Sequence, residues 1–132
     1  MEKDFGPANQ ESCPAANGLW VRQENAWYHH LLERTEFRSA LVARLKTKAY
    51  AFSKTLAKID TRKKDNLYSE MAEAFDRNFE KWDVMGEAVW SQPDDLIAID
   101  TVKGQVDFLH DWLFARYKFV YESYTGEEFI LP

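Results

Sequence analysis

The chain has 132 residues, enough for one domain with a modest core and too few for two. Hydrophobic residues make up 45% and charged residues 30%, which is typical of a globular domain. The formal net charge of −5 argues against nucleic acid, and equally against an anionic membrane surface, as a partner. No apolar run is long enough to span a bilayer, and Cys13, the only cysteine, cannot form an internal disulfide.

Glycine, proline and apolar residues divide the chain into three parts. Residues 1–24 contain the turn-forming pairs Gly6-Pro7, Cys13-Pro14 and Asn17-Gly18, and their apolar residues show no regular spacing. An irregular segment is therefore predicted there. Residues 25–126 carry apolar side chains three or four apart, which indicates helices. Residues 127–132 are predicted to be a tail.

Capping residues set the predicted helix boundaries in the middle part. The predicted helices are a short one from Asn25 to Glu33 and three long ones at Thr35–Lys58, Arg62–Trp82 and Thr101–Tyr124. The expected caps are Asn25, Thr35, Asp60 or Thr61, and Asp100 or Thr101, with Gly126 as the last stop. Residues 91–99 are predicted to be a loop. Because the connections are short, adjacent helices should run antiparallel, and the predicted fold class is a mainly α, antiparallel three- to four-helix bundle.

The third predicted helix carries a polar residue within its apolar stripe. Phe75, Asn78, Phe79 and Trp82 are spaced to share one face, and the helix should stop near Trp82. We expect Trp82, and Trp112 of the last helix, to be largely buried. A buried Asn78 needs a partner, so we expect it to bond a loop carbonyl.

The last predicted helix has two apolar faces, and Arg116 intrudes on them in the way that Asn78 does. Its second face consists of Phe108, Trp112, Ala115 and Phe119. A helix this broadly apolar usually lies between two neighbours. One is the rest of the bundle, and the other is either the short first helix or a surface outside this chain. The second face is therefore a candidate interface, including one between copies of the chain.

The sequence contains no convincing catalytic constellation. His29 and His30 are adjacent on a helix, point apart and form a poor chelate. Asp107 and His110 share a helical face, and such a pair is more often a surface hydrogen bond than half of a metal site. The five glycines are scattered singly, so no phosphate-binding loop is present, and no serine or cysteine lies beside a plausible base.

Aromatic and basic residues do, however, recur in a fixed order along the helical part. They are Trp27, Phe37, Arg44, Arg77, Asn78, Phe79, Trp82, Trp90, Trp112 and Arg116. In order and spacing this set resembles the C-terminal helical region of the spore coat protein H family, the CotH kinases. The resemblance covers about Asn25 to Tyr124. Leu45 is a departure, because the family pattern has a tryptophan after the arginine.

The resemblance implies an atypical protein-kinase-like fold that uses ATP and a divalent metal to phosphorylate protein substrates on serine. Members of the family are spore coat, cell-surface or secreted proteins. The family's metal-binding aspartate sits in a stretch resembling Trp-Asp-x-Asp-x-x-Phe-Gly. Here only Asp4-Phe5-Gly6 remains, with the aspartate next to the phenylalanine, so Asp4 is the one candidate metal residue. The family's nucleotide-binding and catalytic segments lie upstream of the region that matches.

We therefore expect a non-catalytic helical C-terminal subdomain of a CotH-like kinase, one that supports the catalytic lobe or helps to place a substrate. Its partner would be the missing kinase lobe. The alternative is a free-standing helical module that binds another protein. In either case the isolated chain is expected to have no cofactor and no enzymatic activity, because phosphoryl transfer needs a phosphate cradle, metal ligands and a base in one place.

Overall fold

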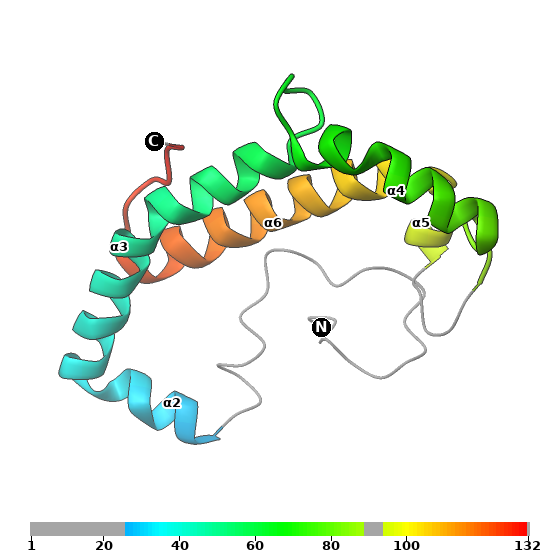
Figure 1. The fold of residues 1–132 in the computed structure, drawn as a ribbon. Helices are drawn as coiled ribbons and strands as arrows, with labels where there is room; N and C mark the ends of the chain where they lie inside the picture. The colour runs from blue at the N-terminus through cyan, green and yellow to red at the C-terminus, as the bar shows by residue number, and fades with distance from the viewer. Residues whose placement is uncertain (1–25, 89–93, 132) are drawn as a thin grey trace.

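The computed structural model describes residues 26–88 and 94–131, and Figure 1 shows their arrangement. Within these ranges the chain is all α, without a strand, as predicted. The helices are α2 (Ala26–Glu33), α3 (Thr35–Ile59), α4 (Leu67–Lys81), α5 (Asp94–Ile97) and α6 (Val102–Thr125). Four of them are main helices that pack together, and α5 is a single turn, so the described part is consistent with a helical bundle.

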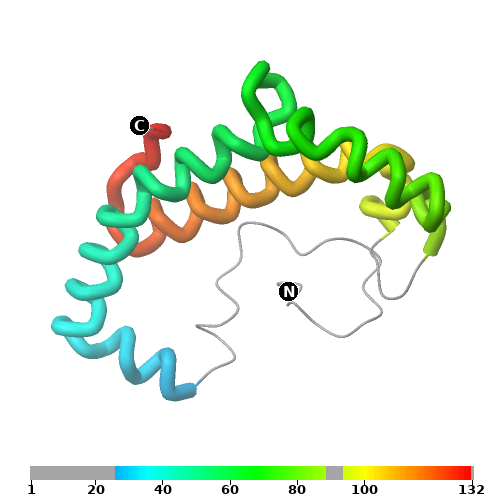
Figure 2. The backbone as a smooth tube through the Cα atoms, viewed as in Figure 1, coloured from blue at the N-terminus to red at the C-terminus, as the bar shows by residue number. Residues whose placement is uncertain are grey.

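The two longest helices, α3 and α6, form the centre of the fold. They run antiparallel and lie side by side along much of their length (Figure 2). The Phe52 and Tyr117 rings stack at 4.0 Å between centroids. The Tyr117 hydroxyl donates a hydrogen bond of 2.8 Å to the carbonyl oxygen of Leu45. An apolar contact and a polar contact therefore hold the same pair of helices in register.

The direction of α4 differs from the expectation that neighbouring helices reverse. Figure 1 shows α4 continuing onward from the end of α3, and α4 packs against the first part of α6. At 1.5 Å per residue, α6 is about 36 Å long, so it has room for contacts with both helices. A short connection permits a reversal but does not require one, because packing against α6 decides where α4 lies.

Two predicted helix starts and one predicted loop need correction. Thr35 is the first residue of α3 and not its cap, since Arg34 occupies the cap position and makes no side-chain cap bond. The third helix starts at Leu67, later than predicted, and is capped by Asn66 instead of Asp60 or Thr61. A single helical turn, α5, lies inside the predicted loop. The predictions that Thr101 caps the last helix and that Gly126 ends it are confirmed, with Gly126 left-handed at φ 70°.

Asn66 is the most buried residue of the described chain, at 1% exposure. Its side-chain oxygen accepts a 2.9 Å hydrogen bond from the Ser69 backbone N–H, the usual cap interaction. Its side-chain nitrogen donates to the Lys63 carbonyl oxygen at 2.5 Å and to the Ser69 hydroxyl at 3.0 Å. One amide therefore both starts α4 and closes the turn that follows α3.

The fully buried apolar core is small and includes a residue of the predicted tail. Among the described residues, Leu32, Leu56 and Phe129 are the buried hydrophobic side chains. The Phe129 ring lies against Phe114, Tyr117 and Tyr121, with centroids 5.0 to 6.4 Å apart. Residues 127–131 thus fold back onto α6 and complete an aromatic cluster, which the tail assignment did not foresee.

Candidate functional site

The helix α4 leaves much of its apolar face uncovered. It is amphipathic, yet none of its residues is buried. Leu67, Met71 and Trp82 are exposed, at 43%, 41% and 59%. At about 100° per residue they fall within about 60° of one another, whereas Phe75 and Phe79 are turned further around and are half-buried. We call Leu67, Met71 and Trp82 the exposed edge of α4.

The prediction that Trp82 is largely buried is wrong. Asn78 is exposed, and it lies on the same side of the helix as the exposed edge. The helix does stop at Trp82, whose backbone N–H donates to the carbonyl oxygen of Asn78 at 2.9 Å. The predicted periodicity was correct, but only one side of the apolar stripe meets α6, so the other side faces water.

The second apolar face of α6 is partly covered. Phe108, Trp112 and Phe119 are half-buried, and Ala115 is exposed. Leu109, one position from Phe108, is exposed at 47%. Arg116 is half-buried, and burial lowers the pKa of its guanidinium from the usual value. The role of this face as an interface stays a prediction.

The richest polar cluster among the described residues joins the α3–α4 connection to α6. His110 is buried, where a surface hydrogen bond with Asp107 was expected. Its Nδ1 lies 3.1 Å from Nη2 of Arg62 and 2.8 Å from the Asp111 carboxylate. A guanidinium only donates and a carboxylate only accepts, so Nδ1 serves one of the two at a time.

The carboxylates around this cluster are held in the charged form. Arg62 donates from Nε to Asp60 at 2.6 Å, and this bond lowers the pKa of Asp60. Lys103, 2.7 Å from Asp107, and the Thr61 hydroxyl, which donates to Asp107, lower the pKa of Asp107. These hydrogen bonds and ion pairs join residues 60–62 to Lys103, Asp107, His110 and Asp111, so the cluster ties the α3–α4 connection to α6.

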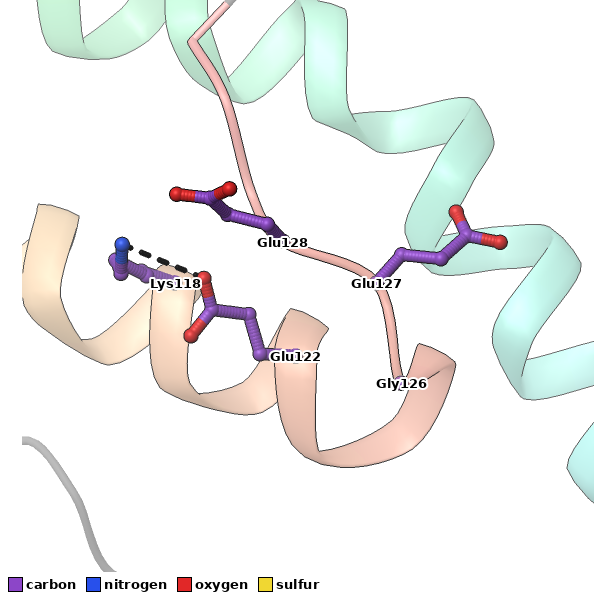
Figure 3. Close-up of a pocket in the computed structure, with 5 residues that line it drawn as sticks. All are labelled: Lys118, Glu122, Gly126, Glu127 and Glu128. Atoms are coloured by element: carbon purple, nitrogen blue, oxygen red, sulfur yellow. Dashed lines mark ion pairs between the residues drawn. The ribbon is translucent and has the colours of Figure 1, made fainter.

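A shallow open depression lies at the end of α6, lined by Lys118, Glu122, Gly126, Glu127 and Glu128 (Figure 3). Glu122 accepts a 3.0 Å hydrogen bond from the Phe129 backbone N–H and lies 3.4 Å from the Lys118 ammonium. Glu127 lies 2.5 Å from Lys46 of α3. Glu122 and Glu127 therefore hold the end of the chain against α6 and α3. The depression is formed where residues 126–128 fold back beside α6.

The residues that carry the family resemblance are spread over the fold and do not form one site. Trp27 is exposed at 72%, Arg44 is exposed, and Arg77 lies 3.6 Å from exposed Glu73. The rings of Tyr28 and Phe37 are nearly perpendicular, with their centroids 5.9 Å apart, where α2 meets α3. Asp4 and Trp90 lie outside the described residues. In the described ranges, no group of three or more histidine, cysteine, aspartate or glutamate side chains is arranged to hold a metal.

We find no match to this chain among protein-family models, curated proteins or solved structures. The resemblance to the spore coat protein H family therefore remains a hypothesis drawn from the residue pattern. None of the helices in residues 26–88 and 94–131 is long and apolar enough to cross a membrane. Sequence reasoning missed Leu67 and Met71 as candidate contact residues, although the apolar stripe of their helix is wider than one neighbouring helix can cover.

Proposed function

We propose that this chain is a non-catalytic helical module that packs against a further protein surface through the exposed edge of α4. The observation that carries this proposal is that α4 has an apolar stripe and no buried residue. Leu67 and Met71 are four residues apart, and Trp82 lies about three turns beyond Met71 on the same side of α4. Apolar residues that gather on one side of an amphipathic helix can fit into a groove, whereas singly scattered ones are common and need no explanation.

The family resemblance suggests what the further surface is. In a CotH-like kinase it would be the catalytic lobe, which would bind ATP and a divalent metal, and this chain would support that lobe or help to place a substrate. The alternative is a free-standing module whose partner is a separate protein. The small core agrees equally well with the kinase subdomain and with the free-standing module. In either case α4, which has no buried residue, would gain much of its stabilisation from the protein surface that covers it.

Two observations separate these readings. The first is the genomic sequence upstream of the codon for Met1. An in-frame extension that encodes kinase-like lysine, aspartate and glycine-rich segments supports the subdomain reading. A stop codon directly before Met1 contradicts it and leaves the free-standing module.

The second observation is a reconstitution. The upstream lobe and this chain are produced as separate polypeptides, and their affinity is measured by calorimetry. Met71→Ser with Trp82→Ser should weaken the complex at least tenfold while the far-ultraviolet circular dichroism of the chain is unchanged, because both side chains are exposed. Ile130→Ser, which also removes an exposed apolar side chain, is the matched control and should bind as the parent chain does. Equal affinity for all three chains would contradict the proposal.

A further inference from the structure

Charge is segregated between the two helices that follow each other along α6. Helix α3 carries six basic residues and one acidic residue, and each of these cations is exposed. Residues 67–100, from α4 to the start of α6, carry nine acidic and two basic residues. The net charge of −5 hides this separation, which is why the whole-chain value gives a poor picture of either surface.

The basic residues of α3 form a face directed away from the core. Arg44, Lys48 and Lys54 fall within about 120° of one another, on the side of the helix away from buried Leu56. Tyr50, exposed at 59%, lies beside them with the Lys54 ammonium 4.7 Å from its ring centre. From Arg44 to Lys54 this basic face of α3 extends about 15 Å at 1.5 Å per residue.

The acidic residues of α4 form a matching row. Glu73, Asp76 and Glu80 recur three and four residues apart, so they share one face of α4, away from its exposed apolar edge. All three are exposed, and the row is about 10 Å long. We call it the acidic face of α4. The acidic face is therefore about two-thirds as long as the basic face and opposite to it in charge.

Within one molecule the two faces belong to helices that follow each other instead of packing side by side along their length. Figure 1 shows α4 continuing onward from the end of α3. The opposite charges do pair where the helices come together, since Lys58 in the last turn of α3 lies 2.9 Å from Glu70 of α4. Within the described residues, no acidic side chain pairs with the three cations of the basic face, and a second molecule can offer them a comparable acidic surface.

From this complementarity we propose that the basic face of α3 docks on the acidic face of α4 of a second copy of this chain. The contact joins two different surfaces, so it is head-to-tail, and the resulting dimer keeps one free basic face and one free acidic face for further addition. Exposed ion pairs are individually weak and are screened by salt. The association should therefore be concentration-dependent and strongest at low ionic strength. It uses other residues than the exposed edge of α4 and can fail without affecting the proposed function.

The test is sedimentation velocity of the full chain and of two charge-reversed variants. Lys48→Glu with Lys54→Glu changes the basic face, and Asp76→Lys with Glu80→Lys changes the acidic face. The parent chain should sediment faster as its concentration rises at about 0.05 M salt and should not do so at about 0.5 M salt. Each variant alone should remain monomeric. An equimolar mixture of the two should associate again, because the unchanged basic face of one variant is complementary to the unchanged acidic face of the other, and the two reversed faces are complementary as well.

The control variant is Lys63→Glu with Lys64→Glu, which makes the same change in net charge at exposed positions outside α3. It should associate as the parent chain does. A parent chain that stays monomeric at low salt, or a basic-face variant that still associates, would overturn the proposal. So would binding of a labelled single-stranded oligonucleotide that is lost on Lys48→Glu with Lys54→Glu while self-association is absent, since the basic face would then serve a nucleic acid.

Discussion

The backbone N–H of Phe129 donates a hydrogen bond of 3.0 Å to the carboxylate of Glu122, one turn before the end of α6. This bond turns the chain back after the left-handed Gly126 and places the Phe129 ring among the aromatic side chains of α6. A segment predicted to be a tail therefore supplies one of the few buried apolar side chains of the described residues.

We expect Phe129→Ala to lower the free energy of unfolding by about 3–5 kcal/mol, because the change leaves a cavity between Tyr117 and Tyr121. Ile130→Ala is the control. Its side chain is exposed at 74%, so the change should stay within about 0.5 kcal/mol. Urea denaturation followed by circular dichroism measures both. Equal stabilities for the two variants would show that residues 127–131 contribute nothing to the core.

The hydrogen bond between Glu122 and Phe129 should depend on pH. The Phe129 N–H lowers the pKa of Glu122, so the charged carboxylate is the form that the folded state prefers. A lowered pKa means that the stabilisation is present above the unfolded value of about 4.3 and is lost as pH falls through the folded value. The amide proton signal of Phe129 should therefore shift in that acidic range. In Glu122→Gln, where the neutral side chain still accepts a bond, the acidic shift should disappear.

Because Asn66 is buried, replacing this polar residue should lower the stability of the fold even though it lies outside the apolar core. Asn66→Ala removes the cap of α4 and leaves the Ser69 N–H and the Lys63 carbonyl oxygen without this partner. We expect a loss of about 1–3 kcal/mol in the free energy of unfolding. Asn78→Ala replaces an exposed asparagine in the same helix and should change stability by less than about 0.5 kcal/mol. Thermal melts of both proteins distinguish a cap from an ordinary surface amide.

Replacing Leu56 by alanine should destabilise the fold more than replacing Trp82 by alanine, although tryptophan is the larger side chain. Trp82 is exposed at 59%, so we expect Trp82→Ala to cost less than about 1 kcal/mol, although sequence reasoning placed it in the core. Leu56 is exposed at only 2%, and Leu56→Ala should cost about 2–5 kcal/mol. Chemical denaturation of the two variants gives the comparison. A larger loss at Trp82 would mean that the exposed edge of α4 is covered in solution.

We expect the isolated chain not to bind ATP–Mg²⁺. Binding a triphosphate needs backbone amides or free cations that converge on the phosphates, and sequence and described residues provide no such cradle. Calorimetric titration should show no saturable heat. A clear isotherm would contradict the non-catalytic reading, and Asp4→Asn would then test whether the one candidate metal residue takes part.

Capping residues and apolar periodicity act over a few neighbouring residues, so the all-helical class and most of the helix ends can be predicted without the structure. Thr101, one of the two predicted caps of the last helix, and Gly126 are examples, and both are confirmed. Which side of each apolar stripe is covered depends instead on how the helices pack against one another. Trp82 faces water and Phe129 is buried, since burial depends on where α6 lies relative to α4 and to the end of the chain. Likewise, the opposite charges of α3 and α4 are visible in the sequence, but their separation in space follows from α4 continuing along α6 instead of folding back.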